Sequence, residues 1–403
     1  MKKGALLISQ INSGGAEHVV SRLTYILKNE YDLDLIIFEN MGGHYPIASK
    51  LINMDIKAES KLIKKIIIFF KRVRTLKRLI NLNKYEFVLS FLDTPNLVNI
   101  ISKTNDCKVI VSIRNYSELE NKKQVLGNLL NLMIKRLYNK ADAIISVTDL
   151  IANNYIKNYN IPSEKIFTIY NPYDIKEIQT LGLEQTEFIN CSNKEKFKFV
   201  SMGRQMYQKG FWHLIKSFSL VLEKIPNSIL IIIGEDYQQG KVEKLIKEMN
   251  LQEKIILTGQ LKNPYAVISK CDCYVLSSLY EGFPNSMVEA MACKIPVIAS
   301  DCKSGPREIL FDKPNFKDEY TQGVEADYGI LVPCLEFEEN WDKNFITQGE
   351  KELSYAMINV IKNTNLRTKL KIKSEIRSKY FNYNLCRERY CDVINKLINK
   401  KKR

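Results

Sequence analysis

The sequence predicts an α/β protein built from two Rossmann-like, doubly wound domains. Three observations lead to this prediction. Short apolar runs alternate with amphipathic stretches along the chain, this alternation restarts after a polar segment near the middle, and 403 residues are too many for one ordinary hydrophobic core. Each half should therefore form a parallel sheet covered by helices, with ligands binding at the carboxyl ends of the strands.

Five apolar runs in the first half are predicted to be strands. They cover residues 4–9, 34–38, 87–91, 108–113 and 143–147. Between them, residues 16–28 and 124–139 carry apolar side chains at helical spacing and are predicted to be helices. Because strands and helices alternate, the strands should pair in parallel.

The second half restarts this alternation after a polar stretch, 179–198, which is the predicted domain linker. Six further apolar runs are predicted to be strands: 197–202, 228–233, 254–258, 273–276, 295–299 and 329–332. The two domains are accordingly expected to span 1–178 and 179–380. A last helix is expected at about 381–403.

Two glutamates, Glu281 and Glu289, follow the apolar run at 273–276. Pro284 favours a helix start, because its missing N–H would have no partner there. Glu281 then lies in the loop after a strand, and Glu289 lies about 7.5 Å further along the helix. The free amides of Phe283–Ser286 would attract a phosphate. This combination suits a sugar nucleotide, whereas the plainer alternative is one first-turn acid and one solvated helix residue.

The segment from Glu281 to Asp301 resembles the E-x7-E signature of the retaining GT-B glycosyltransferases of family 4. The resemblance implies the GT-B fold, in which two Rossmann-like domains face a cleft and the C-terminal helix crosses back to the first domain. It places Glu281 at the donor sugar and Glu289 at the nucleotide ribose. The other donor-binding residues implied in this segment are Gly282, Phe283, Pro284, Asn285 and Ser286.

A second segment, 203–210, follows the first strand of the second half. Its cations are Arg204, a planar group with several donors, and Lys209, a point charge; without context they would be two surface residues. The segment resembles the Gly-Arg…Lys-Gly element of family 4, whose cations neutralise the pyrophosphate. Arg204, Lys209 and Glu281 are thus the predicted catalytic residues, and Gly203 is a predicted donor-binding residue.

The same resemblance assigns four more loop residues to the donor. Gly14 and Gly15 follow the first strand and would lie against the donor diphosphate, although a glycine pair is also a common turn. Gln260 and Leu261 follow another strand, in a segment similar to the one whose backbone contacts the base. The Gly-x-Gly turn that the family often has is replaced here by a longer loop, 234–240.

Arg114 and Asn115 follow a first-half strand and are predicted to lie on the acceptor side. For Arg114 the alternative is a loop residue paired with an acid. Arg307, after the run at 295–299, is a candidate structural residue.

Sixty basic against 45 acidic residues give a net charge of +15, which favours anionic partners. The excess is concentrated in Lys61–Ile80, which has eight lysines or arginines, no acid, and bulky apolar residues such as Ile66 and Phe70. This segment is predicted to be an interfacial helix on an anionic membrane surface. The alternative is a core helix with a solvated basic face. The cations expected to meet lipid are Lys64, Lys65, Arg72 and Arg74.

The nine cysteines are scattered and there are only three histidines, so zinc-type spacing is absent and neither a metal nor another cofactor is predicted. No apolar run approaches the about 18 residues of a membrane span. The start, Met1-Lys-Lys, leads into a strand and not into a signal peptide. With reduced thiols, the predicted location is cytoplasmic, peripheral on the inner face of the cell membrane.

The resemblance implies a retaining, metal-independent transfer of a sugar, a hexose or an N-acetylhexosamine, from a UDP-sugar to an acceptor hydroxyl. The basic, apolar segment favours an acceptor on a lipid diphosphate, such as an undecaprenyl-diphosphate-linked glycan of surface polysaccharide synthesis. Three alternatives stay open. They are a metal-dependent GT-A enzyme, a GT-B hydrolase or epimerase acting on a UDP-sugar, and a basic nucleic-acid-binding protein. Asp32 and Asp34 could bind the metal of a GT-A enzyme, but they are better explained as the start of a strand. The glycine loops argue against a nucleic-acid-binding protein, so no nucleic acid is expected as a partner.

Overall fold

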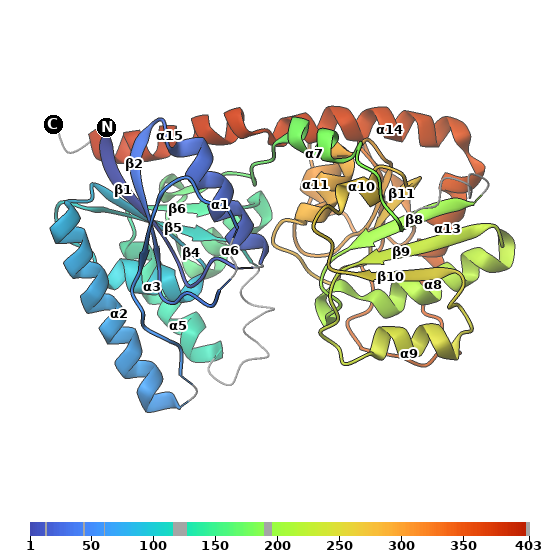
Figure 1. Cartoon of the computed structure of the whole chain (residues 1–403), viewed down its shortest axis with the longest axis horizontal. Helices are drawn as coiled ribbons and strands as arrows, with labels where there is room; N and C mark the ends of the chain where they lie inside the picture. Colours follow the sequence, from blue (N-terminus) through green and yellow to red (C-terminus); the bar gives the residue numbers. More distant parts are fainter. Residues whose placement is uncertain (13, 43–44, 60, 116–126, 189–195, 400–403) are drawn as a thin grey trace. The chain divides into compact units, whose positions relative to one another are not determined.

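The computed structural model describes the chain except residues 13, 43–44, 60, 116–126, 189–195 and 400–403. The chain divides into two compact units, each with its own parallel sheet (Figure 1). Unit 1 comprises Met1–Tyr173 and Tyr383–Arg403, and unit 2 comprises Asp174–Asn382. The two Rossmann-like domains predicted from the alternating pattern are therefore present.

Unit 1 contains a seven-stranded parallel sheet in the order β3-β2-β1-β4-β5-β6-β7. Its strands are β1 (Lys2–Ile8), β2 (Tyr31–Ile37), β3 (Lys50–Asn53), β4 (Phe87–Phe91), β5 (Lys108–Ile113), β6 (Ala143–Ser146) and β7 (Ile166–Thr168). The five predicted strands are confirmed. The two edge strands, β3 and β7, were not predicted, because they are short and only partly buried.

Helices cover both faces of this sheet. They are α1 (Gly15–Leu27), α2 (Leu62–Asn83), α3 (Asp93–Ile101), α5 (Gly127–Leu137), α6 (Asp149–Tyr159) and α15 (Tyr383–Asn399). Helices α1 and α15 pack in one core cluster, to which α15 contributes Cys386, Tyr390 and Ile394. Helices α2 and α3 pack on the opposite face. The C-terminal helix thus belongs to the first unit, as predicted.

Unit 2 repeats the architecture with the strand order β10-β9-β8-β11-β12-β14-β13. Its strands are β8 (Phe197–Met202), β9 (Ser228–Ile233), β10 (Ile255–Gly259), β11 (Cys273–Leu276), β12 (Val297–Ser300), β13 (Val324–Glu325) and β14 (Ile330–Val332). All six predicted strands are present, and the short β13 pairs antiparallel to β14.

The helices of unit 2 are α7 (Ile175–Leu181), α8 (Phe211–Lys224), α9 (Lys241–Glu248), α10 (Tyr265–Ile268), α11 (Asn285–Ala292), α12 (Pro306–Leu310), α13 (Gln348–Lys362) and α14 (Thr364–Ser378). Helices α8, α9 and α13 share one core cluster. Helix α7 contacts α10 and α11, and Gln179 bonds to the carbonyl of Ala292 at 3.2 Å. The start of the predicted linker, 179–198, is therefore part of unit 2, and the units divide five residues before the predicted boundary.

Each sheet has one topological switch point, where the strand order reverses. In unit 1 it lies between β1 and β4, and in unit 2 between β8 and β11. In sheets of this kind, ligands bind at the carboxyl ends of the strands next to the switch point. In unit 2 the loops after these strands carry Lys209 and Glu281.

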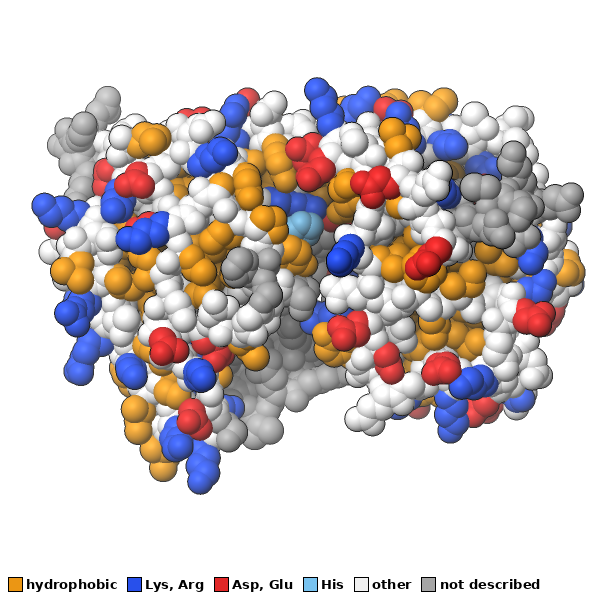
Figure 2. Space-filling view, viewed as in Figure 1, with side chains coloured by type: hydrophobic (Ala, Val, Ile, Leu, Met, Phe, Trp, Pro, Cys, Tyr) orange, Lys and Arg blue, Asp and Glu red, His pale blue; other side chains and the backbone are white. Residues whose placement is uncertain are grey.

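Helix α2, predicted to be interfacial, has two unlike faces. Leu76 and Ile80 are buried against the sheet, and Arg72 is buried with them, bonding to the Ile56 carbonyl at 2.8 Å and lying 4.2 Å from the Phe38 ring centroid. The prediction that Arg72 meets lipid is therefore wrong. The opposite face exposes apolar side chains beside cations (Figure 2). Its exposed apolar residues are Ile63, Ile66, Ile67 and Phe70.

Among the described residues, no helix combines the length and the apolar character that crossing a membrane requires. The described cysteines are free thiols.

Candidate functional site

The loops after β8 and β11 are bonded to each other at the switch point of unit 2. The Leu279 amide donates to the Gln208 carbonyl at 2.8 Å, and the Ser277 hydroxyl donates to the Lys209 carbonyl at 2.8 Å. Gly210 has φ of +58°, and a Cβ there would lie 2.4 Å from the Ser277 carbonyl oxygen. Glycine is therefore required for this close approach.

Lys209 and Glu281 form an ion pair between these loops. Lys209 Nζ lies 2.6 Å from Glu281 Oε1, and both side chains are largely buried. The Ser278 hydroxyl donates to the same oxygen at 2.7 Å, and the Gln208 amide approaches Oε2 at 3.4 Å. Three donors thus hold the Glu281 side chain in position. Gln208 and Ser278 were missed from sequence, although each lies within three positions of a predicted residue.

Two glycines allow the surrounding backbone to pack closely. A Cβ at Gly203 would lie 2.7 Å from Lys209 Cε, so Gly203 leaves room for that side chain. A Cβ at Gly234 would lie 1.9 Å from the Gly203 carbonyl oxygen, and Gly234 has φ of +146°. The longer loop 234–240 is ordered by Asp236, which accepts from the amides of Gln238 and Gly240 at 2.7 and 2.6 Å.

Helix α11 begins at Asn285, one residue later than predicted, with Pro284 as its cap. Glu289 is 5% exposed, which excludes the solvated helix residue of the plainer interpretation. The Tyr274 hydroxyl on β11 donates to Ser286 at 2.7 Å. Burial raises the pKa of Tyr274, and the charges of Glu281 and Glu289 raise it further, so both carboxylates lie near this hydroxyl.

A turn after β12 supports the loop that carries Glu281. The Glu281 amide donates to the Lys303 carbonyl at 2.6 Å, and the Ser304 hydroxyl donates to the Gly282 carbonyl at 2.8 Å. A Cβ at Gly305, which has φ of +101°, would lie 2.5 Å from Pro284 Cδ. The turn therefore fixes the backbone between Glu281 and the start of α11. The predicted donor residue Phe283 packs against Phe381, with ring centroids 5.5 Å apart.

Arg204 is exposed at the rim of this site and lies over the Tyr237 ring, 5.6 Å from its centroid. Gln260 and Leu261 follow Gly259, whose carbonyl accepts from the Gly234 amide at 2.9 Å. These predicted residues therefore lie around the same end of the sheet. Arg307 forms two bonds to Asp301, at 2.7 and 2.6 Å, which agrees with a structural role.

We expect Arg204→Ala to lower turnover about 10²-fold, because one charge-stabilising donor is removed. The midpoint of thermal unfolding should hardly change, since an exposed side chain makes little contribution to stability. Steady-state kinetics and thermal melts of the same preparation test both statements. Normal turnover would remove Arg204 from the candidate catalytic residues, and Arg136→Ala, at an exposed arginine on α5 of unit 1, is a matched control.

In unit 1, Gly14 caps α1 in an extended conformation, and Gly15 is the first helical residue. A Cβ at Gly14 would lie 2.0 Å from Glu17 Oε2, so the Glu17 carboxylate folds back over the helix start. Arg114 is 6% exposed and donates to the side-chain amide oxygen of Asn171. The partner of Arg114 in this bond is an amide and not an acid. The acceptor-side role of Arg114 and Asn115 stays a prediction.

His18, on α1, stacks on Tyr45 with ring centroids 4.5 Å apart. Burial lowers the pKa of His18 from 6.5 to about 3, and the charge of Arg22 adds to this effect. The ring is therefore neutral in the folded protein at pH values where the unfolded chain is protonated.

This shift predicts a loss of stability in mild acid. The unfolded chain binds a proton at His18 below pH 6.5 and the folded chain does not until about pH 3, so the free energy of unfolding falls as the pH is lowered between these values. The thermal midpoint of His18→Gln should decrease less than that of the wild type between pH 7 and pH 4.5. Parallel profiles for the two proteins would contradict the shift.

The GT-A alternative depends on Asp32 and Asp34. Both lie within β2, and Asp34 accepts from the Tyr85 hydroxyl at 2.5 Å inside the core. They are strand residues, as the sequence indicated. In the part of the chain that the structure describes, no group of three or more His, Cys, Asp or Glu residues is placed to hold a metal ion.

Two parallel-sheet units of this kind, with the C-terminal helix returned to the first, define a GT-B glycosyltransferase fold. Residues 13–177 match the family model described as Glycosyltransferase Family 4, and residues 184–316 match Glycosyl transferases group 1. The chain belongs to this family of glycosyltransferases.

Individual relatives agree with the assignment. The chain is 33% identical over 347 residues to an uncharacterized glycosyltransferase of Methanocaldococcus jannaschii, covering 85% of this chain and 83% of the relative. It is 28% identical to the Campylobacter jejuni enzyme named N-acetylgalactosamine-N,N'-diacetylbacillosaminyl-diphospho-undecaprenol 4-alpha-N-acetylgalactosaminyltransferase, covering 94% of this chain and 96% of that enzyme. The crystal structure of Anabaena HepE with UDP and glucose superposes with a TM-score of 0.72 at 17% identity, covering 98% and 100% of the two chains.

Proposed function

We propose that this glycosyltransferase moves a sugar from a UDP-sugar, with retention of configuration, to a hydroxyl of a glycan carried on a lipid diphosphate. The proposal of a sugar-nucleotide donor rests on the Lys209–Glu281 ion pair at the switch point of unit 2. A cation for the diphosphate and a carboxylate for the sugar hydroxyls lie side by side there. The UDP in the Anabaena structure supports the choice of nucleotide.

The donor's groups find suitable partners around the loops of unit 2. Arg204 and Lys209 neutralise the diphosphate, and the start of α11 adds the positive end of its helix dipole. Glu281 binds the sugar hydroxyls and Glu289 the ribose hydroxyls. The backbone after β10, at Gln260 and Leu261, faces the base.

The reaction exchanges one bond at the anomeric carbon. The bond from this carbon to the diphosphate oxygen breaks with its electron pair moving to the phosphate, and the acceptor oxygen bonds to the same face of the sugar. The acceptor proton passes to the departing phosphate. The protein contributes fixed positive charge where negative charge develops, so the step needs no bound metal. Activity should therefore survive a strong chelator, and its loss with recovery on adding Mn²⁺ would contradict this part.

The acceptor class is supported by two independent features. The Campylobacter relative is named for an undecaprenol-diphosphate-linked acceptor. Helix α2 exposes Ile63, Ile66, Ile67 and Phe70 at positions i, i+3, i+4 and i+7, flanked by Lys64, Lys71 and Arg74. An apolar stripe bordered by cations fits the surface of an anionic bilayer, where a lipid-linked glycan is held. The protein would then be peripheral on the cytoplasmic face of the membrane.

A panel of UDP- and GDP-sugars tests the donor assignment. We expect one UDP-sugar to raise the thermal midpoint, and to be consumed faster when a lipid-diphosphate-linked sugar is added. Product analysis by NMR then gives the anomeric configuration. Hydrolysis or epimerisation of the donor without transfer to any acceptor would instead favour the hydrolase or epimerase alternative.

A further inference from the structure

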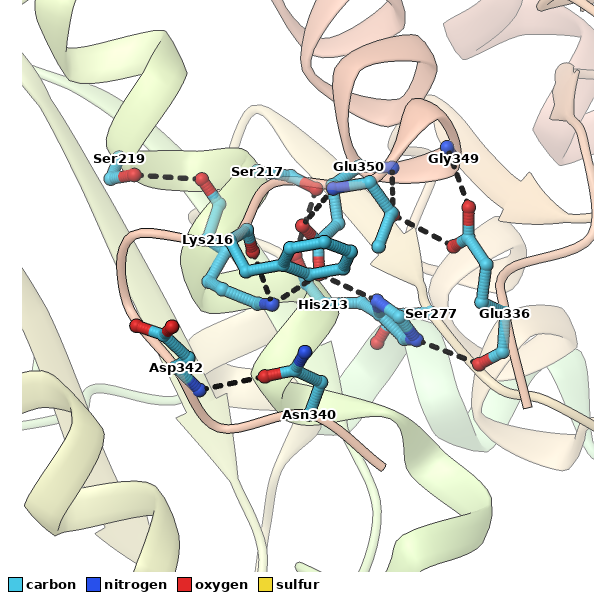
Figure 3. A network of polar contacts seen from close by, with 12 residues as sticks. His213, Lys216, Ser217, Ser219, Ser277, Glu336, Asn340, Asp342, Gly349 and Glu350 are labelled. Carbon is cyan, nitrogen blue, oxygen red and sulfur yellow. Dashed lines mark hydrogen bonds and ion pairs between the residues drawn. The ribbon is translucent and has the colours of Figure 1, made fainter. Parts of the chain in front are cut away.

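A buried network of charges in unit 2 lies outside the residues assigned to the donor (Figure 3). Its centre is Glu350, on the first turn of α13. Glu350 Oε1 lies 2.7 Å from His213 Nδ1 and 2.9 Å from Lys216 Nζ, and all three side chains are at most 1% exposed. Glu350 Oε2 accepts from the Thr347 amide at 2.9 Å, which closes a capping box at the start of α13. The network therefore ties α8 to α13.

Two polar contacts fix the orientation of the His213 ring. Its Nε2 lies 3.0 Å from the Glu336 carbonyl oxygen, and its Nδ1 faces the Glu350 carboxylate. Both partners are acceptors, and they lie at opposite nitrogens of the ring. The ring and Lys216 share one carboxylate. Because a buried charge without a partner is costly, this arrangement fixes the position of the ring.

The network continues to the segment that carries Lys209. His213 donates to the Glu336 carbonyl, and the Tyr207 hydroxyl donates to the next carbonyl along, that of Phe337. Tyr207 and His213 flank Lys209 in sequence, and residues 207–209 form a single 3-10 turn that leads into α8. Two consecutive carbonyls of the connection between β14 and α13 thus hold the backbone on both sides of Lys209.

We infer that His213 is a positioning residue, which through the Glu336–Phe337 backbone keeps Lys209 opposite Glu281 and so sets the affinity for the nucleoside diphosphate. This inference rests on the proposed function, because it takes Lys209 as the diphosphate cation. Glu350 and Lys216 hold the ring from the other side.

Two substitutions at His213 separate an effect on the position of Lys209 from an effect on the stability of the fold. The amide of His213→Gln can replace Nε2 and keep the bond to the Glu336 carbonyl, whereas the amide of His213→Asn replaces Nδ1 and keeps only the bond to Glu350. Both variants lose one buried hydrogen bond, so both should unfold at a lower temperature. Only His213→Asn releases the Glu336–Phe337 backbone. We therefore expect its dissociation constant for UDP to rise about 10-fold, and that of His213→Gln to stay within about twofold of the wild type.

Calorimetric titration with UDP at a temperature where every variant is folded tests the inference. Tyr207→Phe should weaken UDP binding like His213→Asn, and the double variant should be no weaker than either alone, since both act on one backbone segment. Ser219→Ala is the control, because its hydroxyl bonds to the Lys216 carbonyl on the same helix, at 2.7 Å.

The fluorescence of the chain's two tryptophans gives a second readout. The Trp212 ring lies 5.6 Å from Tyr207 and 5.5 Å from Trp341, so both report on the turn that carries Lys209. Emission of UDP-free His213→Asn should differ from that of His213→Gln. Equal UDP affinities for these two variants would overturn the positioning role. A wild type that does not bind UDP would overturn the proposed function, and this inference with it.

Discussion

Lys209→Ala is expected to lower turnover by about 10²- to 10³-fold, because it removes the buried cation that faces the departing diphosphate. It also leaves the Glu281 carboxylate without its ion-pair partner in a site where Glu281 is only 6% exposed. A buried charge that loses its partner destabilises the fold, so the thermal midpoint should fall as well. Release of UDP from the donor, measured with saturating acceptor, gives the rate.

A double variant separates these two effects. In Lys209→Ala with Glu281→Gln, the unpaired charge is removed, so the thermal midpoint should recover while turnover stays low. Lys244→Ala is the lysine control, because Lys244 is exposed on α9 and lies 3.7 Å from Glu248 at the surface. Turnover near that of the wild type in Lys209→Ala would refute the role of this cation.

The strands were predicted well wherever they are buried on both faces. Central strands of a parallel sheet read as continuous apolar runs, and β4, β5, β8, β9 and β11 have the predicted bounds. The edge strands β3 and β7 lack this signal, because one side of each is not covered by another strand. The end of helix α7, residues 179–181, was taken for the start of a linker, since the helix is only seven residues long and buries just two of them, Ile175 and Ile178.

The sequence predicted which residues belong to the candidate site, but not the contacts between them. Lys209 and Glu281 were assigned from two separate motifs, but their ion pair joins positions 72 apart and depends on the switch point between β8 and β11. The supporting side chains, Gln208 and Ser278, carry no motif of their own. His213 and Glu350 are 137 positions apart, and nothing local marks them as partners.

The helical spacing around Arg72 indicates that this side chain lies on the buried face of α2. Residues four and eight positions apart lie on one face of a helix, so Arg72 shares its face with Leu76 and Ile80, which are buried. The same periodicity puts Ile63, Ile67, Phe70 and Arg74 on the opposite face. The number of cations in the segment predicted a membrane contact, but the spacing decides which of them are available to lipid.

The second large effect is expected from the exposed cations of α2. Changing Lys64, Lys65, Lys71 and Arg74 to Gln should weaken binding to vesicles containing anionic lipid about 10³-fold, because each cation near such a surface contributes about 1 kcal/mol. Arg72 is kept, since its substitution would unfold the contact with Ile56 and Phe38. Sedimentation with liposomes measures binding, and its salt dependence should be smaller for the variant.

The charge-matched control changes Lys241, Lys244, Lys247 and Lys254 of unit 2, which lowers the net charge by the same amount on another surface. If binding depends on the face of α2 and not on total charge, this control should sediment with vesicles like the wild type. Ile66, Ile67 and Phe70 changed to Ser should also release the protein, at every salt concentration, because burial of apolar surface is not screened. Hydrolysis of the UDP-sugar in the absence of acceptor should persist in all three variants, whereas transfer to a lipid-linked acceptor should fall in both α2 variants. Vesicle binding that survives both changes would show that α2 does not face the membrane, and would leave the lipid-linked acceptor without structural support.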